Sequence, residues 1–284
     1  MPHISCPVAV HANVTCHAAG VAVLREASVP GAPSLPPRFL RHADEHTVVG
    51  IRAVQEAMAA VGRRQGSFPS GATNRFAVVA APCGAGRPAS ARTLVNLREG
   101  GPVTVSPHVV PQCSLHAVAS AVSVGLRIHG PNIGVGGGRE ALSEAFITAL
   151  SLLDEPGVDG CWLVLTAWDD EPTLGGRGDL PGDAVCRGVA LALDRAAAGS
   201  LKLSLRTEPS LTVIDKASPT FLPSRSSLAE LGAFLDRAAQ ASGADRDKHD
   251  DGCGWSFRLG WGATVHLEPA PARVGARERR RDAA

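Results

Sequence analysis

The spacing of apolar and polar residues predicts a series of buried strands along the chain. Short apolar runs that end in turn residues suit strands inside a sheet. Such runs lie at 7–14, 20–24, 75–82, 132–135, 161–170 and 185–194, and a closing strand or hairpin lies at 255–269. The first two runs are close enough in sequence to form a hairpin.

Helices are predicted between most of these runs. Apolar positions that recur every three or four residues, small-residue stretches and glycine stops indicate helices. These segments are 41–62, 91–99, 112–127, 140–153 and 228–242. The alternation of strands and helices predicts an α/β fold in which helices are layered on a central sheet.

The composition changes near residue 216 and suggests how the chain is organised. We predict a first unit at 1–215, a C-terminal helix and closing strand at 216–271 packed on the same domain, and a disordered basic tail at 272–284. The tail holds a cluster of arginines typical of a solvated chain end.

Length and composition exclude several classes of protein. The 284 residues are 44% hydrophobic, enough for a full core, and the net charge of +1 gives no reason to expect nucleic acid as a partner. No window approaches 18 uninterrupted apolar residues and the start lacks a secretory pattern, so we expect no membrane span and a cytoplasmic protein. Seven scattered cysteines without a CxxC pair suit reduced thiols better than disulfides or a zinc site.

A glycine-rich loop at 130–146 is the first candidate site. Its sequence GPNIGVGGGREALSEAF resembles a phosphate-binding loop that enters a helix. Arg139 and Glu140 stand where a third glycine or a lysine belongs, and the Glu140 carboxylate would repel a phosphate. We therefore predict no nucleotide cofactor.

Two further motifs have a chemical and a structural interpretation. In HADEH, His42 and His46 lie one turn apart with Glu45 between them, as in an inverted zinc-peptidase motif. The alternative is that both histidines are surface residues in the first turn of a helix. Cys113 and His116 could pair as thiolate and base, or they could pack in an alanine-rich helix.

Several segments resemble β-ketoacyl synthases in family order. The family's SPxxVP segment, small-residue helix, GPN and strand are resembled by SPHVVPQCSLHAVASAVSVGLRIHGPNIGV. Its first helix is resembled by RHADEHTVVGIRAVQEAMAAVG. Strands of the same half are resembled by RFAVVAAPCGAG, CWLVLTAWDDEP and VCRGVALALDRAAAG. The resemblance covers about residues 36–200 and implies a thiolase-like α/β/α layered domain, extended here by a short C-terminal helix and strand.

The resemblance also implies where the nucleophile should be. In that family the strand after GPN ends in a turn that presents a cysteine at a helix N-terminus, where the positive helix end and free N–H groups stabilise a thiolate. The turn residues here are Gly136, Gly137, Gly138 and Arg139, and the cysteine position is Arg139. A guanidinium cannot form an acyl thioester.

The second half departs further from an active condensing enzyme. The two histidine motifs and the lysine of that family have no counterpart after residue 200, where the histidines are His249 and His266. The chain is also much shorter than a full ketosynthase. It is most similar to the shortened β-ketoacyl synthase-like N-terminal family, which resembles chain-length-factor subunits.

The resemblance leads to a functional prediction with two alternatives. It implies a catalytically degenerate partner of an active ketosynthase in type II fatty-acid or polyketide synthesis, with aryl polyenes as one product class, acyl carrier protein as substrate donor and no cofactor. It also implies a hetero- or homodimer in which the small-residue segment 112–127 lies near the dimer interface. The first alternative is an acyltransferase or thioesterase that uses Cys113 with His116, or Ser143. The second is an anion-binding module formed by 136–139.

Overall fold

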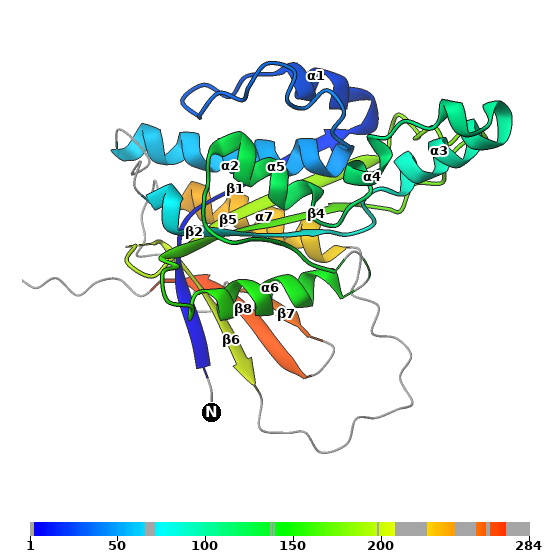
Figure 1. Cartoon of the computed structure of the whole chain (residues 1–284). Helices are drawn as coiled ribbons and strands as arrows, with labels where there is room; N and C mark the ends of the chain where they lie inside the picture. Colours follow the sequence, from blue (N-terminus) through cyan, green and yellow to red (C-terminus); the bar gives the residue numbers. More distant parts are fainter. Residues whose placement is uncertain are drawn as a thin grey trace, which may run out of the picture.

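A computed structural model of the chain describes residues 3–65, 72–136, 138, 140–197, 199–207, 226–241, 254–259 and 262–270. Its described parts form one mixed sheet with helices on both faces (Figure 1). The predicted α/β layered fold is confirmed.

Eight strands make up the sheet. They are β1 (His3–His17), β2 (Phe76–Pro82), β3 (Asn132–Gly134), β4 (Gly160–Trp168), β5 (Val185–Asp194), β6 (Leu201–Thr207), β7 (Trp255–Arg258) and β8 (Ala263–Pro269). Their order is β3-β2-β4-β5-β1-β6-β8-β7. β2 runs parallel to β3 and β4, and all other neighbouring pairs are antiparallel.

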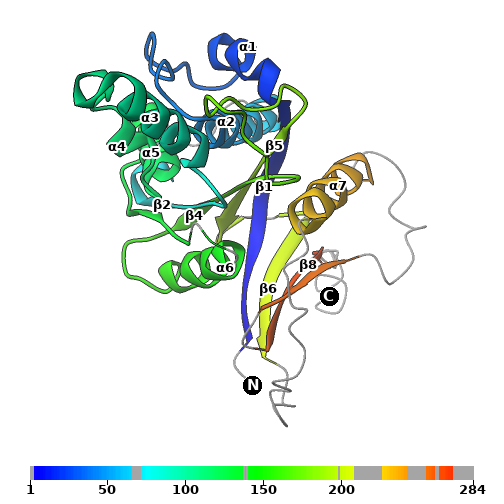
Figure 2. The same cartoon turned by 90° about the vertical axis from the view of Figure 1, so that its right-hand side faces the viewer.

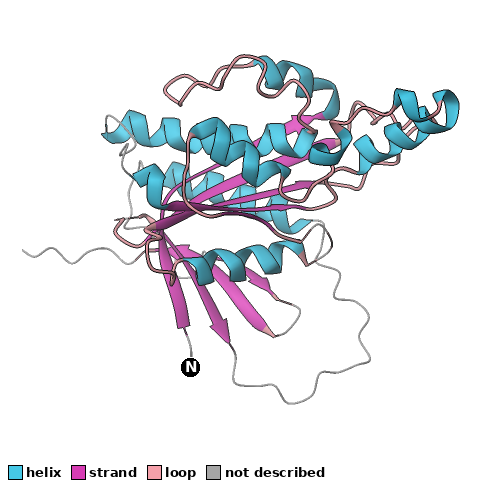
Figure 3. Cartoon of the chain, in the orientation of Figure 1, coloured by secondary structure: helices cyan, strands magenta, loops and turns pink. Residues whose placement is uncertain are grey.

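Helices cover the two faces of this sheet (Figure 3). They are α1 (Val21–Glu26), α2 (Glu45–Gln65), α3 (Arg87–Gly100), α4 (Val109–Gln112), α5 (Ala117–Leu126), α6 (Ala141–Leu152) and α7 (Ser226–Ala241), with short 3-10 turns η1 (Ala18–Gly20), η2 (Ala72–Arg75) and η3 (Pro102–Thr104). α2 and α5 pack on one face, and α6 and α7 pack on the other (Figure 2). Among the described residues, no helix is both long enough and apolar enough to cross a bilayer.

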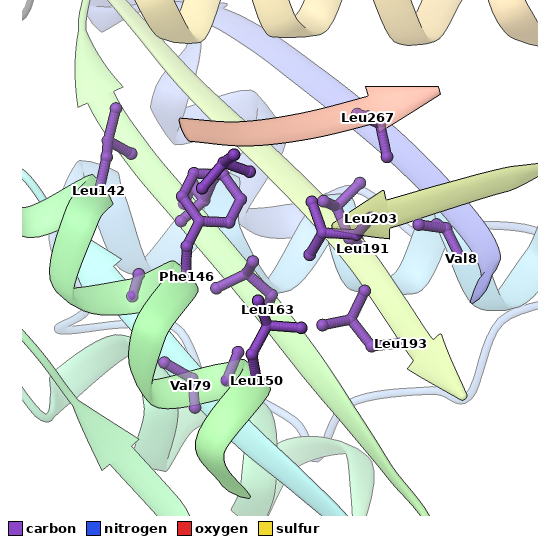
Figure 4. Packing of buried hydrophobic residues seen from close by; sticks show 14 of the residues in the cluster. Val8, Val79, Leu142, Phe146, Leu150, Leu163, Leu191, Leu193, Leu203 and Leu267 are labelled. Carbon is purple, nitrogen blue, oxygen red and sulfur yellow. The ribbon is translucent and has the colours of Figure 1, made fainter. Parts of the chain in front are cut away.

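The core on the α6 side is built from leucines of several elements. Phe146 and Leu150 of α6 face Leu163 and Leu191 of the strands, and Leu203 of β6 lies nearby (Figure 4). Each such side chain, fully buried, contributes about 1.5–3 kcal/mol through the hydrophobic effect. Their common burial fixes the position of α6 against the sheet.

The C-terminal helix and strands share this cluster. Leu231 of α7, Trp255 of β7 and Leu267 of β8 belong to the same buried group as Phe146. The Trp255 ring lies parallel to that of Phe257, with centroids 6.0 Å apart. β7 and β8 form an antiparallel hairpin, the second of the two forms expected for 255–269.

The predicted N-terminal hairpin is wrong. The run 7–14 lies within the single long strand β1, which a bulge between Val8 and Val10 lets pair with both β5 and β6. The run 20–24 enters α1, which packs on α2 and buries Val21 while Val23 stays exposed. Residues 3–8 of β1 pair with β6 and residues 8–17 pair with β5, while the residues after β1 turn away from the sheet and pack on α2 as α1.

The predicted helix over 112–127 begins five residues later than expected. α4 ends at Gln112 and α5 begins at Ala117. Between them the Ser114 hydroxyl accepts a hydrogen bond from the His116 N–H at 3.2 Å, a local bond that competes with helix formation. The predicted helix over 41–62 begins later than expected, at Glu45, where the Asp44 carboxylate caps the Thr47 N–H at 2.8 Å.

Candidate functional site

The carboxyl ends of three parallel strands define the candidate site. β3, β2 and β4 are neighbours, so the residues that follow them meet at one edge of the sheet. Ligands of α/β proteins commonly bind at this edge. Cys83 follows β2, the glycine turn follows β3, and Asp169 follows β4.

The turn after β3 is sharp and depends on Gly136. Its φ of +72° is in the left-handed region, and a Cβ there would lie 2.4 Å from the Ala141 Cα at the start of α6. Val135 remains in the sheet and donates a hydrogen bond to the Ala80 carbonyl at 2.9 Å. This geometry brings the chain directly from strand to helix N-terminus. Gly137 and Arg139, which the sequence places in this turn, lie outside the described residues.

Cys83 lies beside this turn. Its N–H donates to the Thr166 carbonyl at 2.8 Å, and its thiol lies 3.6 Å from the Gly138 carbonyl oxygen. Burial, followed by the nearby Glu171 carboxylate, raises the pKa of the Cys83 thiol, although Arg87 opposes this shift. The thiol is therefore protonated at neutral pH and is a poor nucleophile.

Two charged side chains of opposite sign, Arg87 and Glu171, lie near Cys83. Arg87 at the start of α3 forms an ion pair with Glu171 at 2.8 Å. Gly84, with φ of +76°, allows close approach because a Cβ there would be 3.2 Å from a Glu171 carboxylate oxygen. Both charged side chains are partly exposed, so the pair organises the loops more than it stabilises the fold.

The structure does not join Cys113 to His116. The Cys113 thiol lies 3.2 Å from the Ser90 hydroxyl and 3.5 Å from the Gly86 carbonyl. The His116 side chain is exposed on the loop before α5, and no hydrogen bond between thiol and imidazole exists among the described residues.

Ser143 is a buried helix residue rather than an exposed hydroxyl. It lies in the first turn of α6, is 4% exposed, and donates to the Glu140 carboxylate at 3.1 Å. No imidazole or amine contacts it within the described chain.

The HADEH residues diverge in the structure. His46 is buried edge-on against Trp168, and its Nδ1 lies 2.9 Å from the Thr166 hydroxyl. His42 instead stacks on His108, with ring centroids 4.5 Å apart. Across the described ranges, no three His, Cys, Asp or Glu side chains are grouped as a metal would require.

Burial perturbs two groups of this motif. It lowers the pKa of His46, while Asp44 and Glu171 act in the opposite direction. It also raises the pKa of Glu45, whose carboxylate lies 4.0 Å from Arg92. The second interpretation of HADEH is confirmed in that the motif leads into α2 and His42 is exposed, but it is wrong for His46, which is buried against the sheet.

Sequence reasoning missed Cys83, Arg87 and Glu171 as neighbours of the glycine turn. Cys83 and Glu171 follow predicted buried strands, at the end where functional residues of parallel sheets gather, and that position was a usable signal. Which strands lie next to each other could not be read from the runs themselves.

Taken together, the layered sheet and the turn from β3 into α6 define a thiolase-like fold of the ketosynthase kind. The chain is similar to "The ishigamide ketosynthase/chain length factor", with a TM-score of 0.59 and 15% identity over 94% of this chain and 100% of that one. It is also similar to a type II polyketide ketosynthase in complex with its acyl-carrier protein, the AntDE:AntF structure, with a TM-score of 0.58 and 10% identity over 95% and 100% of the two chains.

A third similar structure is the ketosynthase ApeO with its chain length factor ApeC from Xenorhabdus doucetiae. The TM-score is 0.51 at 13% identity, over 94% of this chain and 97% of that one. No protein-family model matches the chain, and no curated protein matches it. The resemblance to a shortened chain-length-factor-like ketosynthase homologue is therefore confirmed at the level of the fold.

Proposed function

We propose that the chain is a chain-length-factor-like subunit that pairs with an active ketosynthase and carries out no condensation itself. The similar structures include ketosynthases with chain length factors and one with an acyl-carrier protein, and we carry these associations over to this chain. The pathway class would be type II fatty-acid or polyketide synthesis, with aryl polyenes as one candidate product class. Substrates would arrive on acyl carrier protein.

The observation that carries the proposal is an exposed apolar segment. Seven large apolar side chains of the described chain are strongly exposed, and six of them fall within residues 94–124. We call these six the apolar ridge; they are Leu94, Leu97, Val103, Val110, Leu115 and Val124. They come from α3, η3, α4, the loop after α4, and α5. α3 contacts both η3 and α4, so these three elements present four of the six side chains in one region. Exposed apolar side chains gathered in one region are typical of protein interfaces.

The ridge adjoins an unpaired sheet edge. Among the described strands, β3 pairs only with β2, so its other edge is available. The loop before α5 lies directly on this strand, since a Cβ on Gly134 would be 2.2 Å from the Leu115 carbonyl oxygen. An unpaired edge beside apolar side chains is a surface that a partner can cover.

The site chemistry supports a partner without condensing activity. The sequence has Arg139 at the position of the expected nucleophile. The described thiols nearby are Cys83, which burial keeps protonated, and Cys113, which no imidazole contacts. We infer that the partner supplies the reactive cysteine, while this chain shapes the acyl cavity or holds the complex together.

Co-expression with a ketosynthase from the same genome tests the interface. Val110→Asp places a charge in the ridge, whereas Val23→Asp places one on α1 outside it, and the two valines are 74% and 75% exposed. Size-exclusion chromatography with light scattering should show that Val110→Asp weakens the complex at least tenfold and that Val23→Asp leaves it intact. A complex that tolerates Val110→Asp as well as Val23→Asp would remove the ridge from the interface.

A further inference from the structure

A cleft between α7 and the sheet has the features of a second binding site. It encloses about 220 Å³ and lies between α7 and strands β1 and β5. Its polar walls include Arg187 of β5 and Asp236 of α7, and its apolar walls include Val189, Leu228 and Ala233. It is formed by elements on the α6 side of the sheet and uses no residue of the apolar ridge.

The guanidinium of Arg187 is held rigidly at one wall. It forms a two-point ion pair with Asp169, with Nη2 2.7 Å from Oδ2 and Nε bonded to Oδ1, and its Nη1 donates to the Thr15 hydroxyl at 2.9 Å. The hydrogen bonds to Asp169 raise the pKa of Arg187, as do the negative charges of Asp169 and Asp236, although burial opposes the shift. Three of the five N–H groups are thus occupied, and two have no acceptor among the described residues.

Asp236 is oriented at the other wall. Its Oδ1 accepts a hydrogen bond from the Asn13 side-chain amide at 2.7 Å, and the same amide donates to the Gly232 carbonyl at 3.2 Å. Within the described residues, Asp236 and Arg187 form no ion pair at 4.0 Å or less, although both line the cleft. A donor and an acceptor therefore face one space without satisfying each other.

The charges around the cleft exclude several ligand classes. Asp169 already neutralises Arg187, and Asp236 leaves the surroundings with a net negative charge. A carboxylate or phosphate would meet this negative charge, so anions are disfavoured. A neutral group that accepts a hydrogen bond at one end and donates one at the other would satisfy both walls.

We propose that this cleft binds an uncharged, amide-bearing chain, with a carbonyl oxygen toward Arg187 and an amide N–H toward Asp236. Ala233, the exposed one of the three apolar lining residues, contacts its hydrocarbon portion, whereas Val189 and Leu228 are almost fully buried behind the cleft. Water alone would satisfy the polar walls but would leave the Ala233 side chain wet, so a ligand with both characters fits better.

Nuclear magnetic resonance of the full chain tests this with N-acetyl-alanine N′-methylamide as the probe. The side-chain N–H signals of Asn13 and Arg187 should shift in a saturable way, with a dissociation constant on the order of millimolar for so small a ligand. Ala233→Leu should weaken binding at least tenfold by filling the cleft, and Ala239→Leu, an exposed α7 position outside the cleft lining, should leave it unchanged.

Two charged probes complete the test. Butyrate should bind at least tenfold more weakly than the amide. The proposal is wrong if the amide causes no saturable shift, if butyrate binds equally well, or if butylammonium alone binds, since the last result would make Asp236 a simple cation site. The proposal is equally wrong if the Ala233→Leu variant binds the amide as tightly as the Ala239→Leu variant does.

Discussion

Gly136 determines the path of the chain from β3 into α6. Its positive φ and the 2.4 Å approach to Ala141 leave no room for a side chain. Gly136→Ala should lower the free energy of unfolding by about 2–5 kcal/mol, because it adds backbone strain to overpacking. Gly138→Ala in the same turn should change it by about 1 kcal/mol or less, since nothing lies within 4 Å of that Cβ. Urea unfolding of the two variants measures the difference, and equal effects would contradict this geometry.

His46 should make stability depend on pH. Burial lowers its pKa from the ordinary 6.5, so the unfolded chain binds a proton more readily than the folded one. The free energy of unfolding should therefore fall as the pH decreases below about 6.5. His46→Gln should show a shallower decrease between pH 6.5 and 5 in denaturant titrations. A decrease as steep as in the unchanged protein would show that another group causes it.

At the scale of single residues, sequence spacing proved a limited guide to contacts. Cys113 and His116 are three apart, as a helical pair requires, but a local Ser114 hydrogen bond ends the helix between them. The contact between Cys83 and Gly138 joins residues 55 positions apart and depends on β3 lying beside β2. Such a contact follows from the order of the strands, which a single sequence does not reveal.

At the scale of elements, the C-terminal hairpin should depend on the common core. Leu267 of β8 is fully buried in the cluster that contains Phe146 of α6. Leu267→Ala should cost about 2–5 kcal/mol, as expected for a large core truncation. Thr264→Ala, on the other face of β8, should stay within about 0.5 kcal/mol.

Two probes of the same unfolding reaction test whether the hairpin and the layered sheet are one unit. Helix circular dichroism and tryptophan fluorescence should lose signal in one shared transition, which Leu267→Ala moves to lower denaturant concentration. A separate early fluorescence transition in Leu267→Ala, with helices intact, would instead make residues 216–271 an independent unit.

The sequence predicted strands more readily where both faces of the strand are buried than where only one face is buried. β2 and β4 appear as unbroken apolar runs because helices cover both faces. β6 (Leu201–Thr207) was not predicted, although its alternation of buried leucines with polar residues is the period of a one-sided strand. The small-residue composition of 112–127 predicted a helix there, but it did not reveal that α5 begins only at Ala117, where Val118 and Ala119 are buried.

At the scale of the whole molecule, the resemblance to ketosynthases predicted the fold better than the site. The layered sheet matches ketosynthase and chain-length-factor structures over almost the whole chain. The chemistry of the glycine turn depends on Arg139 and Gly137, which lie outside the described residues, so their predicted roles stay predictions. The resemblance implied a dimer interface near 112–127, the segment that holds Leu115 and Val124 of the apolar ridge. The other four ridge residues were not expected from the sequence, because their exposure depends on how α3, η3 and α4 are placed.

Intact-mass spectrometry of this chain, co-purified with its ketosynthase and exposed to acyl-loaded carrier protein, tests the central claim most directly. We predict an acyl adduct on the ketosynthase and none on this chain, since the nucleophile position is Arg139 and no imidazole among the described residues hydrogen-bonds to Cys83 or Cys113. An adduct on this chain that maps to Cys83, Cys113 or Ser143 would contradict the account and make the protein an acyl-transferring enzyme.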